Sequence, residues 1–122
     1  MKIILVDAWN TFIKNKKIDS NIYNILEDFK NKKIILTNAN TKELVKYGII
    51  NMPYEVFSLS HDPNKDNPFY FKLLIEKYNL IIDNLIYIEH NNEAVKSAKS
   101  IGIKTHHYNP NEPIEELSKF LL

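Results

Sequence analysis

The feature that most constrains the fold is the apolar run Ile3-Ile4-Leu5-Val6, which ends directly in an acid, Asp7. The run contains no polar alternation, which is typical of a strand buried on both faces of a parallel sheet. In open α/β sheets, the residues that follow such strands line a crevice at the carboxyl edge of the sheet. The start of the chain therefore predicts a buried strand that presents Asp7 to a crevice.

Similar apolar runs recur along the chain, and segments with helical spacing separate them. Further strands are predicted at residues 34–36, 54–59, 85–88 and 103–108, with 54–59 nearer an edge. Helix starts are predicted at Asp19 or Ser20, Asn40, Asn67–Pro68, Glu93 and Pro113. Residues 11–17 are expected to form a short polar connection, and residues 60–67 a turn region. Because parallel strands need helical crossovers, this alternation predicts an α/β fold with a five-stranded parallel sheet.

The composition limits the classes of partner. The chain has 122 residues, enough for one domain, and its net charge is only +1. Every basic residue is a lysine, so the bidentate guanidinium contacts that read phosphate or guanine cannot form, and we expect no nucleic-acid partner. No apolar stretch is long enough to cross a membrane, and the lack of cysteine excludes disulfides and thiolate metal sites. We expect a cytoplasmic protein.

Polar residues follow three of the predicted strands. Since the carboxyl ends of parallel strands share one edge, these side chains are expected to meet there. A carboxylate, a hydroxyl, an ammonium and a second acid at one crevice are suited to nucleophilic displacement on an anionic substrate. In that scheme Asp7 attacks, Thr37 and Lys65 hold the developing charge, and the loop at Glu89 places a cation or orients Lys65. The groups concerned are Asp7, Thr37-Asn38, Lys65 and Glu89-His90-Asn91.

Four segments in this order resemble the motifs of the haloacid dehalogenase-like (HAD) superfamily of hydrolases, over nearly the whole chain. They are residues 4–11, residues 34–38, Lys65 ahead of Asn67-Pro68, and residues 86–93 followed by a helix and Gly102. The resemblance implies a three-layer α/β/α sandwich with the first strand central, in a single domain 1–122 without an inserted cap. It also implies that Asp7 is the nucleophile of a phosphohydrolase-type site and forms a covalent intermediate. Thr37 and Lys65 complete the implied catalytic set, and Trp9, Thr11, Asn38 and Asn91 contact the substrate.

The sequence departs from the family pattern at two places. Family phosphatases carry a second aspartate two residues after the nucleophile, where this chain has Trp9, and an indole cannot transfer a proton at neutral pH. The family also holds Mg²⁺ with the nucleophile, the backbone carbonyl at the position of Trp9, and an acid of the fourth motif. His90 stands at that acid's position, and because Mg²⁺ prefers oxygen ligands, Glu89 would have to serve instead.

These departures leave three functions open. The first is a hydrolase of weak or specialised activity, in which Glu89, His90, His61 or a partner chain activates water. The second is a non-catalytic domain that binds a phosphorylated ligand or a protein. The third is metal-independent 2-haloacid dehalogenase chemistry, because those enzymes carry the same pattern Asp-Ala-aromatic. It is ranked lower because they also need an inserted cap that encloses the substrate.

The missing cap suggests a phosphorylated small molecule or macromolecule as substrate, with a partner or self-association covering the open crevice. Two further pairs that contain histidine are not expected to be functional. His106 and His107 are adjacent in a strand and project to opposite faces, and His61-Asp62 is expected to belong to a polar turn.

Overall fold

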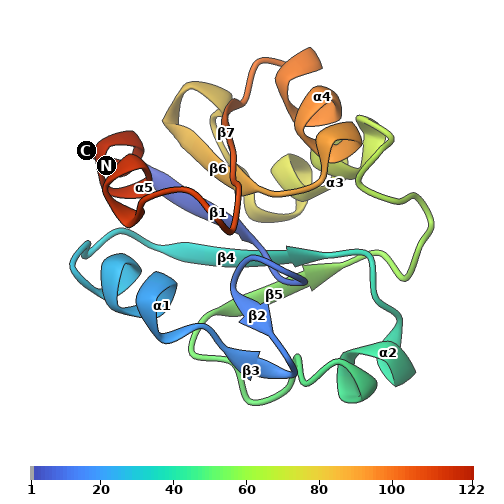
Figure 1. The fold of residues 1–122 in the computed structure, drawn as a ribbon. Coiled ribbons are helices and arrows are strands. Elements are labelled where there is room, and N and C mark those ends of the chain that lie inside the picture. Colours follow the sequence, from blue (N-terminus) through green and yellow to red (C-terminus); the bar gives the residue numbers. More distant parts are fainter. Residues whose placement is uncertain (1) are drawn as a thin grey trace.

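The computed structural model describes residues 2–122 and is built on a five-stranded parallel sheet flanked by helices (Figure 1). The sheet consists of β1 (Ile3–Asp7), β4 (Lys33–Thr37), β5 (Glu55–Ser58), β6 (Leu85–Glu89) and β7 (Lys104–His107). The helices are α1 (Ser20–Glu27), α2 (Thr41–Lys46), α3 (Phe69–Tyr78), α4 (Asn92–Ser100), α5 (Ile114–Leu121) and the 3-10 turn η1 (Ile82–Asn84).

The strand order is β5-β4-β1-β6-β7, which places β1 in the centre and β5 at an edge. Val6 pairs with Ile35 of β4 on one side and with Ile88 of β6 on the other. This register brings the carboxyl ends of β1, β4 and β6 to the same level. The predicted fold class, the central first strand and the edge position of residues 55–58 are confirmed.

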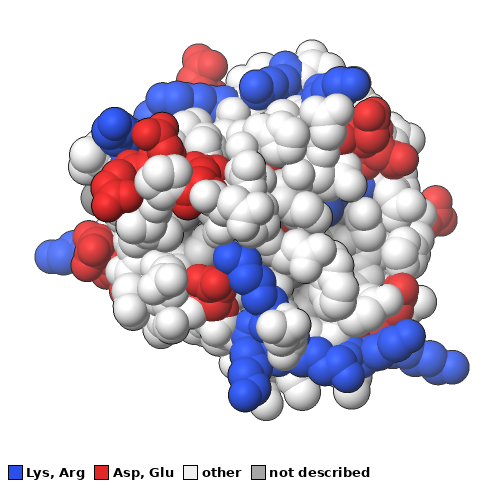
Figure 2. Space-filling view, in the orientation of Figure 1, with Lys and Arg blue, Asp and Glu red and all other residues white. Residues whose placement is uncertain are grey.

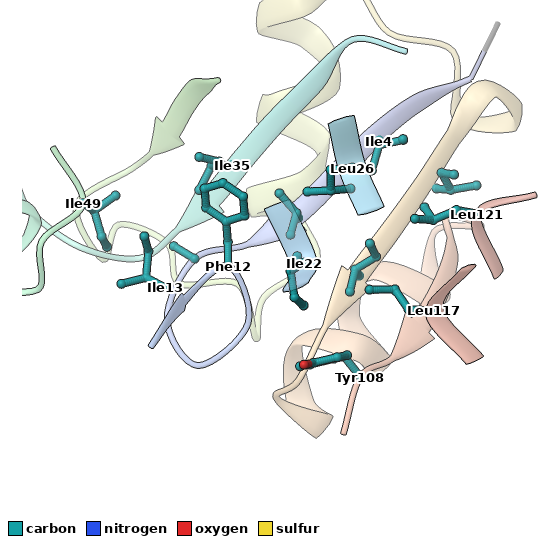
Figure 3. Packing of buried hydrophobic residues seen from close by; sticks show 14 residues of the cluster. Ile4, Phe12, Ile13, Ile22, Leu26, Ile35, Ile49, Tyr108, Leu117 and Leu121 are labelled. Carbon is teal, nitrogen blue, oxygen red and sulfur yellow. The ribbon is translucent and has the colours of Figure 1, made fainter. Parts of the chain in front are cut away.

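The core lies in two layers, one on each face of the sheet. Successive residues of β1 point to opposite faces, so Ile4 and Val6 join one hydrophobic cluster and Leu5 joins the other. The first cluster includes buried residues of α1 and α5, and Figure 3 shows Ile22, Leu26, Leu117 and Leu121 converging there. The second includes buried residues of α3 and α4, namely Tyr70, Phe71, Leu74 and Ala98.

Side-chain caps begin several helices as the sequence indicates. Asp19 accepts a hydrogen bond from the amide of Ile22 at the start of α1, and Asn40 forms a capping box with Glu43 at the start of α2. The predicted cap of α3 is confirmed, because Asn67 Oδ1 accepts from the amide of Phe69 at 3.0 Å. Pro68 has helical backbone angles, and α3 itself spans Phe69–Tyr78, one residue after the predicted start.

The expectation of a polar connection at residues 11–17 is also wrong. The chain there forms an antiparallel hairpin of β2 (Ile13–Lys14) and β3 (Lys17–Ile18). Phe12 and Ile13 are fully buried and point into the first core cluster, beside Ile35 and Ile49 (Figure 3). These two apolar side chains anchor the hairpin to the sheet.

The hairpin also abuts the end of α2. Gly48, which follows that helix, has a φ of +76°, and a Cβ at this position would lie 2.5 Å from the carbonyl oxygen of Lys16. Glycine is therefore required both for the left-handed backbone and for the close approach of the hairpin.

The surface mixes both signs of charge. On the face shown in Figure 2, lysines gather along the lower edge, in the region of β3 and α2, while acids are scattered. Across residues 2–122, none of the helices combines the length and the apolar character needed to cross a membrane.

Candidate active site

The carboxyl ends of β1, β4 and β6 border a crevice of about 480 Å³. The loop that carries Lys65 closes one side of it, and the segment after β1 contributes Trp9. Of the residues predicted for the site, eight line this crevice: Asp7, Trp9, Thr37, Asn38, Lys65, Glu89, His90 and Asn91.

Lys65 links the two acids at the floor of the crevice. Its Nζ lies 2.7 Å from Oε1 of Glu89 and also contacts Oδ1 of Asp7. The exposed fractions of Asp7, Lys65 and Glu89 are 2%, 5% and 0%, so the ammonium and both carboxylates lie out of bulk water. The backbone amide of Lys65 donates to Oδ1 of Asn38 at 2.7 Å, which fixes the loop that delivers the lysine.

His90 contacts the same two acids from the other side. Its Nδ1 lies 2.6 Å from Oδ2 of Asp7 and 3.4 Å from Oε2 of Glu89. The hydroxyl of Thr11 donates to Oδ2 of Asp7 at 3.0 Å. Asp7 is therefore held by three side chains, and both of its oxygens accept hydrogen bonds.

Glu89 is held just as firmly. The phenol of Tyr87 donates to its Oε1, and the amide of Asn91 donates to its Oε2 at 3.0 Å. Sequence reasoning treated Tyr87 as an apolar strand residue and missed this contact. The signal was present, because residues two apart in a strand share a face, which puts the phenol beside the carboxylate.

The charges of this cluster are strongly coupled. Burial and the nearby Glu89 raise the pKa of Asp7, although Lys65 and His90 act in the opposite direction. Burial alone would raise the pKa of Glu89, but the positive charge of Lys65 and the hydrogen bonding of His90 outweigh it and lower that pKa. Hydrogen bonds to Asp7 and Glu89 raise the pKa of His90 to about 9. At neutral pH, two cations thus face two acids.

Thr37 and Asn38 form the wall supplied by β4. Oγ1 of Thr37 accepts from the amide of Ala39 at 3.2 Å, which shapes the backbone after the strand. The hydroxyl of Tyr70 lies 2.9 Å from the carbonyl oxygen of Thr37 and 3.0 Å from that of Phe57. This buried phenol ties the ends of β4 and β5 together.

Two of the residues predicted to contact substrate are held by hydrogen bonds within the protein. Thr11 is fully buried, donates its hydroxyl to Asp7 and does not line the crevice, and its contact with a substrate stays a prediction. Asn91 lines the crevice, but its side chain caps α4 by accepting from the amide of Ala94 at 3.1 Å.

The rim of the crevice is partly aromatic. Trp9 is 43% exposed, and its ring centroid lies 4.6 Å from that of Tyr47. His61 also lines the crevice, with Nε2 placed 2.5 Å from Glu43 and Nδ1 2.8 Å from Asn64. Both of its ring nitrogens are thus engaged, and His61 joins α2 to the loop at residues 60–67.

The prediction for the pair in β7 agrees with the structure. Nε2 of His106 lies 2.9 Å from a carboxylate oxygen of Glu112, whereas Nε2 of His107 donates to the backbone carbonyl of His90 at 2.9 Å. The two rings therefore have separate partners, as expected for adjacent residues of a strand.

Comparison with solved structures identifies the fold. A predicted HAD-like family hydrolase from Porphyromonas gingivalis has a TM-score of 0.74 and 11% identity, over 99% of this chain and 98% of that one. The core domain of a protein assigned as a phosphoglycolate phosphatase, from Streptococcus pneumoniae, has a TM-score of 0.63 and 16% identity, over 98% and 94%. The chain has the HAD-like hydrolase fold. No model of a known protein family and no curated protein sequence matches it.

A third similar structure contains ligands. It is an aspartate-to-alanine mutant of a HAD family enzyme from Bacteroides thetaiotaomicron in complex with magnesium and inorganic phosphate. Its TM-score is 0.63 at 20% identity, over 82% of this chain and 58% of that one. The shared HAD-like fold raises the question of whether the present residues suit Mg²⁺.

Asp7, Glu89 and His90 each offer one ligand atom, and these atoms lie within 4.8 Å of one another. Mg²⁺ prefers an octahedron of oxygen ligands, whereas an imidazole nitrogen is a better ligand for transition metals such as zinc, copper or nickel. All four carboxylate oxygens already accept from protein donors. With His90 in this position, the donor set of this site does not fit Mg²⁺. Coordination of Mg²⁺ by Asp7, Glu89 and the backbone carbonyl of Trp9 is a prediction from the sequence that stays untested.

Proposed function

We propose that the protein is a phosphate-ester hydrolase of the HAD type that uses Asp7 as its nucleophile. The observation that carries this proposal is the position of Lys65, whose ammonium joins Asp7 to Glu89 at the floor of an open crevice. A cation in this position binds the oxygens of a phosphoryl group. Its positive charge offsets the repulsion between that negatively charged group and the two acids. Thr37, on the adjacent wall, supplies a hydroxyl for the same group.

The proposed reaction has two displacements at phosphorus. In the first, a carboxylate oxygen of Asp7 attacks, an Asp7–phosphorus ester bond forms, and the bond to the leaving oxygen breaks. The leaving oxygen takes a proton from His90, which lines the crevice, contacts Asp7 and is protonated at neutral pH. In the second, neutral His90 takes a proton from water as the water oxygen attacks phosphorus, which releases phosphate and restores Asp7.

This scheme assigns to His90 the proton transfer that the indole of Trp9 cannot perform. It also agrees with the similarity in fold to a HAD-like family hydrolase and to a protein assigned as a phosphoglycolate phosphatase, a similarity that by itself does not extend to activity. We propose a phosphorylated small molecule or macromolecule as substrate. A larger substrate, a partner or a second copy of the chain would cover the crevice from outside.

The test is hydrolysis of 4-nitrophenyl phosphate together with intact-mass analysis after incubation with acetyl phosphate. We expect the wild type to gain the mass of one phosphoryl group and to turn over the ester. Asp7→Asn should do neither, while Asp83→Asn, a change at an exposed acid in η1, should match the wild type. Equal labelling and equal rates for wild type and Asp7→Asn would refute the proposal.

A second candidate is a domain that binds phosphate esters without turnover. It is favoured because every oxygen of Asp7 and Glu89 already accepts from a protein donor, which lowers the reactivity of Asp7. Trp9 is the only tryptophan of the chain and lines the crevice, so its fluorescence reports binding there. A phosphate-dependent change in that fluorescence, with no labelling and no turnover, would support this candidate over the first.

A further inference from the structure

The carboxylate oxygens that Lys65 does not contact lie on either side of one ring nitrogen. Nδ1 of His90 is 2.6 Å from Oδ2 of Asp7 and 3.4 Å from Oε2 of Glu89. A divalent cation that served both acids would have to lie between these same two oxygens. The imidazole of His90 therefore fills the space that such a cation would need.

His90 is held in this place by its backbone as well as its ring. Its carbonyl accepts from Nε2 of His107 at 2.9 Å, and the carbonyl of the preceding Glu89 accepts from the amide of Tyr108 at 2.7 Å. The following residue, Asn91, donates its amide to Glu89 and caps α4 with its side chain. Because both neighbours are fixed, a cation could enter only by displacing the ring itself.

The residue types agree with this geometry. The cluster holds two acids, Asp7 and Glu89, and Lys65 and His90 each contact both of them. Carboxylates that already contact nitrogen donors of the protein have less attraction for a divalent cation than free carboxylates. The contacts of the acids and the position of the ring thus act in the same direction.

We propose that the side chain of His90 takes the place of the divalent cation in this site, so that the protein binds inorganic phosphate without Mg²⁺. Removal of the imidazole then opens the position between Asp7 and Glu89 to Mg²⁺. The part concerning phosphate rests on the proposed function, whereas the part concerning the metal rests only on the geometry of the three residues.

The metal part is tested by titrating Mg²⁺ alone into the protein and measuring heat by calorimetry. His90→Asp, which adds a third carboxylate, should bind Mg²⁺ at least about tenfold more tightly than the wild type. His90→Ala should show a gain in the same direction. His106→Ala is the matched control, because the ring of His106 faces Glu112 instead of the crevice, and it should bind as the wild type does.

Two results of this titration would overturn the proposal. One is wild-type affinity for Mg²⁺ equal to that of His90→Asp, and the other is no gain in a folded His90 variant. Circular dichroism establishes which variants are folded. If His90→Asp does not fold, the Mg²⁺ affinity of His90→Ala decides the question.

The phosphate part is tested by titrating inorganic phosphate and following the fluorescence of Trp9. In the wild type, the dissociation constant should differ less than about twofold between EDTA and Mg²⁺, whereas His90→Asp should lose about tenfold in EDTA. Wild-type binding that disappears in EDTA would overturn the proposal. No phosphate binding under either condition would refute the proposed function, and the Mg²⁺ titration would still decide whether His90 excludes the metal.

Discussion

Replacing Lys65 by methionine would show how much of the fold depends on the charge cluster. Lys65→Met keeps most of the apolar stem but removes the ammonium between Asp7 and Glu89, which are both buried. Breaking a buried ion pair by removing one partner costs roughly 3–5 kcal/mol, because the remaining charge is left without compensation. Here two carboxylates remain and share His90 as their one remaining cationic partner, so we expect a loss of about that size at pH 7.

The pH dependence of this loss identifies its cause. Without Lys65, burial and mutual repulsion raise the pKa of one of the two carboxyls far above its value in the unfolded chain. The folded variant then binds a proton that the unfolded chain does not, so its stability rises as the pH falls, by up to about 1.4 kcal/mol per unit. Between pH 7 and pH 5 the difference from wild type should therefore shrink by roughly 2–3 kcal/mol.

The assay is urea denaturation followed by far-ultraviolet circular dichroism at both pH values. Lys72→Met is the matched control, since Lys72 is exposed on α3, and its effect should stay within about 0.5 kcal/mol. A loss below about 1 kcal/mol for Lys65→Met, or a larger loss that is the same at pH 5 and pH 7, would refute the electrostatic reasoning.

Three further predictions concern the surroundings of the site. The pKa of His90 is raised from 6.5 to about 9. The contribution of protonated His90 to the free energy of unfolding is therefore complete below pH 6.5 and is lost as the pH rises through about 9. Urea denaturation across this range should show the wild type losing its higher stability relative to His90→Gln. Gly48→Ala should cost about 1–3 kcal/mol, because it places a Cβ against the carbonyl of Lys16 at a positive φ, and the denaturation midpoint should fall without a change in slope. Tyr70→Phe should cost about 1–3 kcal/mol by leaving buried groups of Thr37 unpaired, and hydrogen exchange at the Thr37 amide should accelerate.

The convergence of the site residues follows from rules that a sequence displays directly. Apolar runs without alternation indicated the strands, and the first polar residue after each run indicated the crevice. Asp7, Thr37 and Glu89 meet for that reason, since β1, β4 and β6 are parallel neighbours. Lys65 does not follow a strand, and nothing local distinguishes it from a solvated lysine in a turn, so its assignment to the site depended mainly on the family resemblance.

Other parts of the site depend on contacts that no short pattern reveals. The hairpin has strands of only two residues, too short for any periodicity, and its position depends on burial of Phe12 and Ile13. The contact between His90 and Asp7 joins residues 83 positions apart, through the direction of one side chain in a loop. The contact of Tyr87 differs, because its spacing of two from Glu89 did indicate a shared face, but the otherwise apolar strand has a pattern typical of core packing.

The anchoring of the hairpin has a consequence for the rim of the crevice. To swing away from the sheet, the hairpin would have to expose Phe12 and Ile13, which are fully buried. Burial of one such side chain contributes about 1.5–3 kcal/mol, so the two together hold the hairpin down by roughly 3–6 kcal/mol. A free-energy difference of about 1.4 kcal/mol changes an equilibrium constant tenfold. With roughly 3 kcal/mol or more against it, the raised hairpin makes up less than about 1% of the molecules. Because the backbone of Trp9 is bridged to Ile13, the same anchoring holds Trp9 in one position at the rim of the crevice.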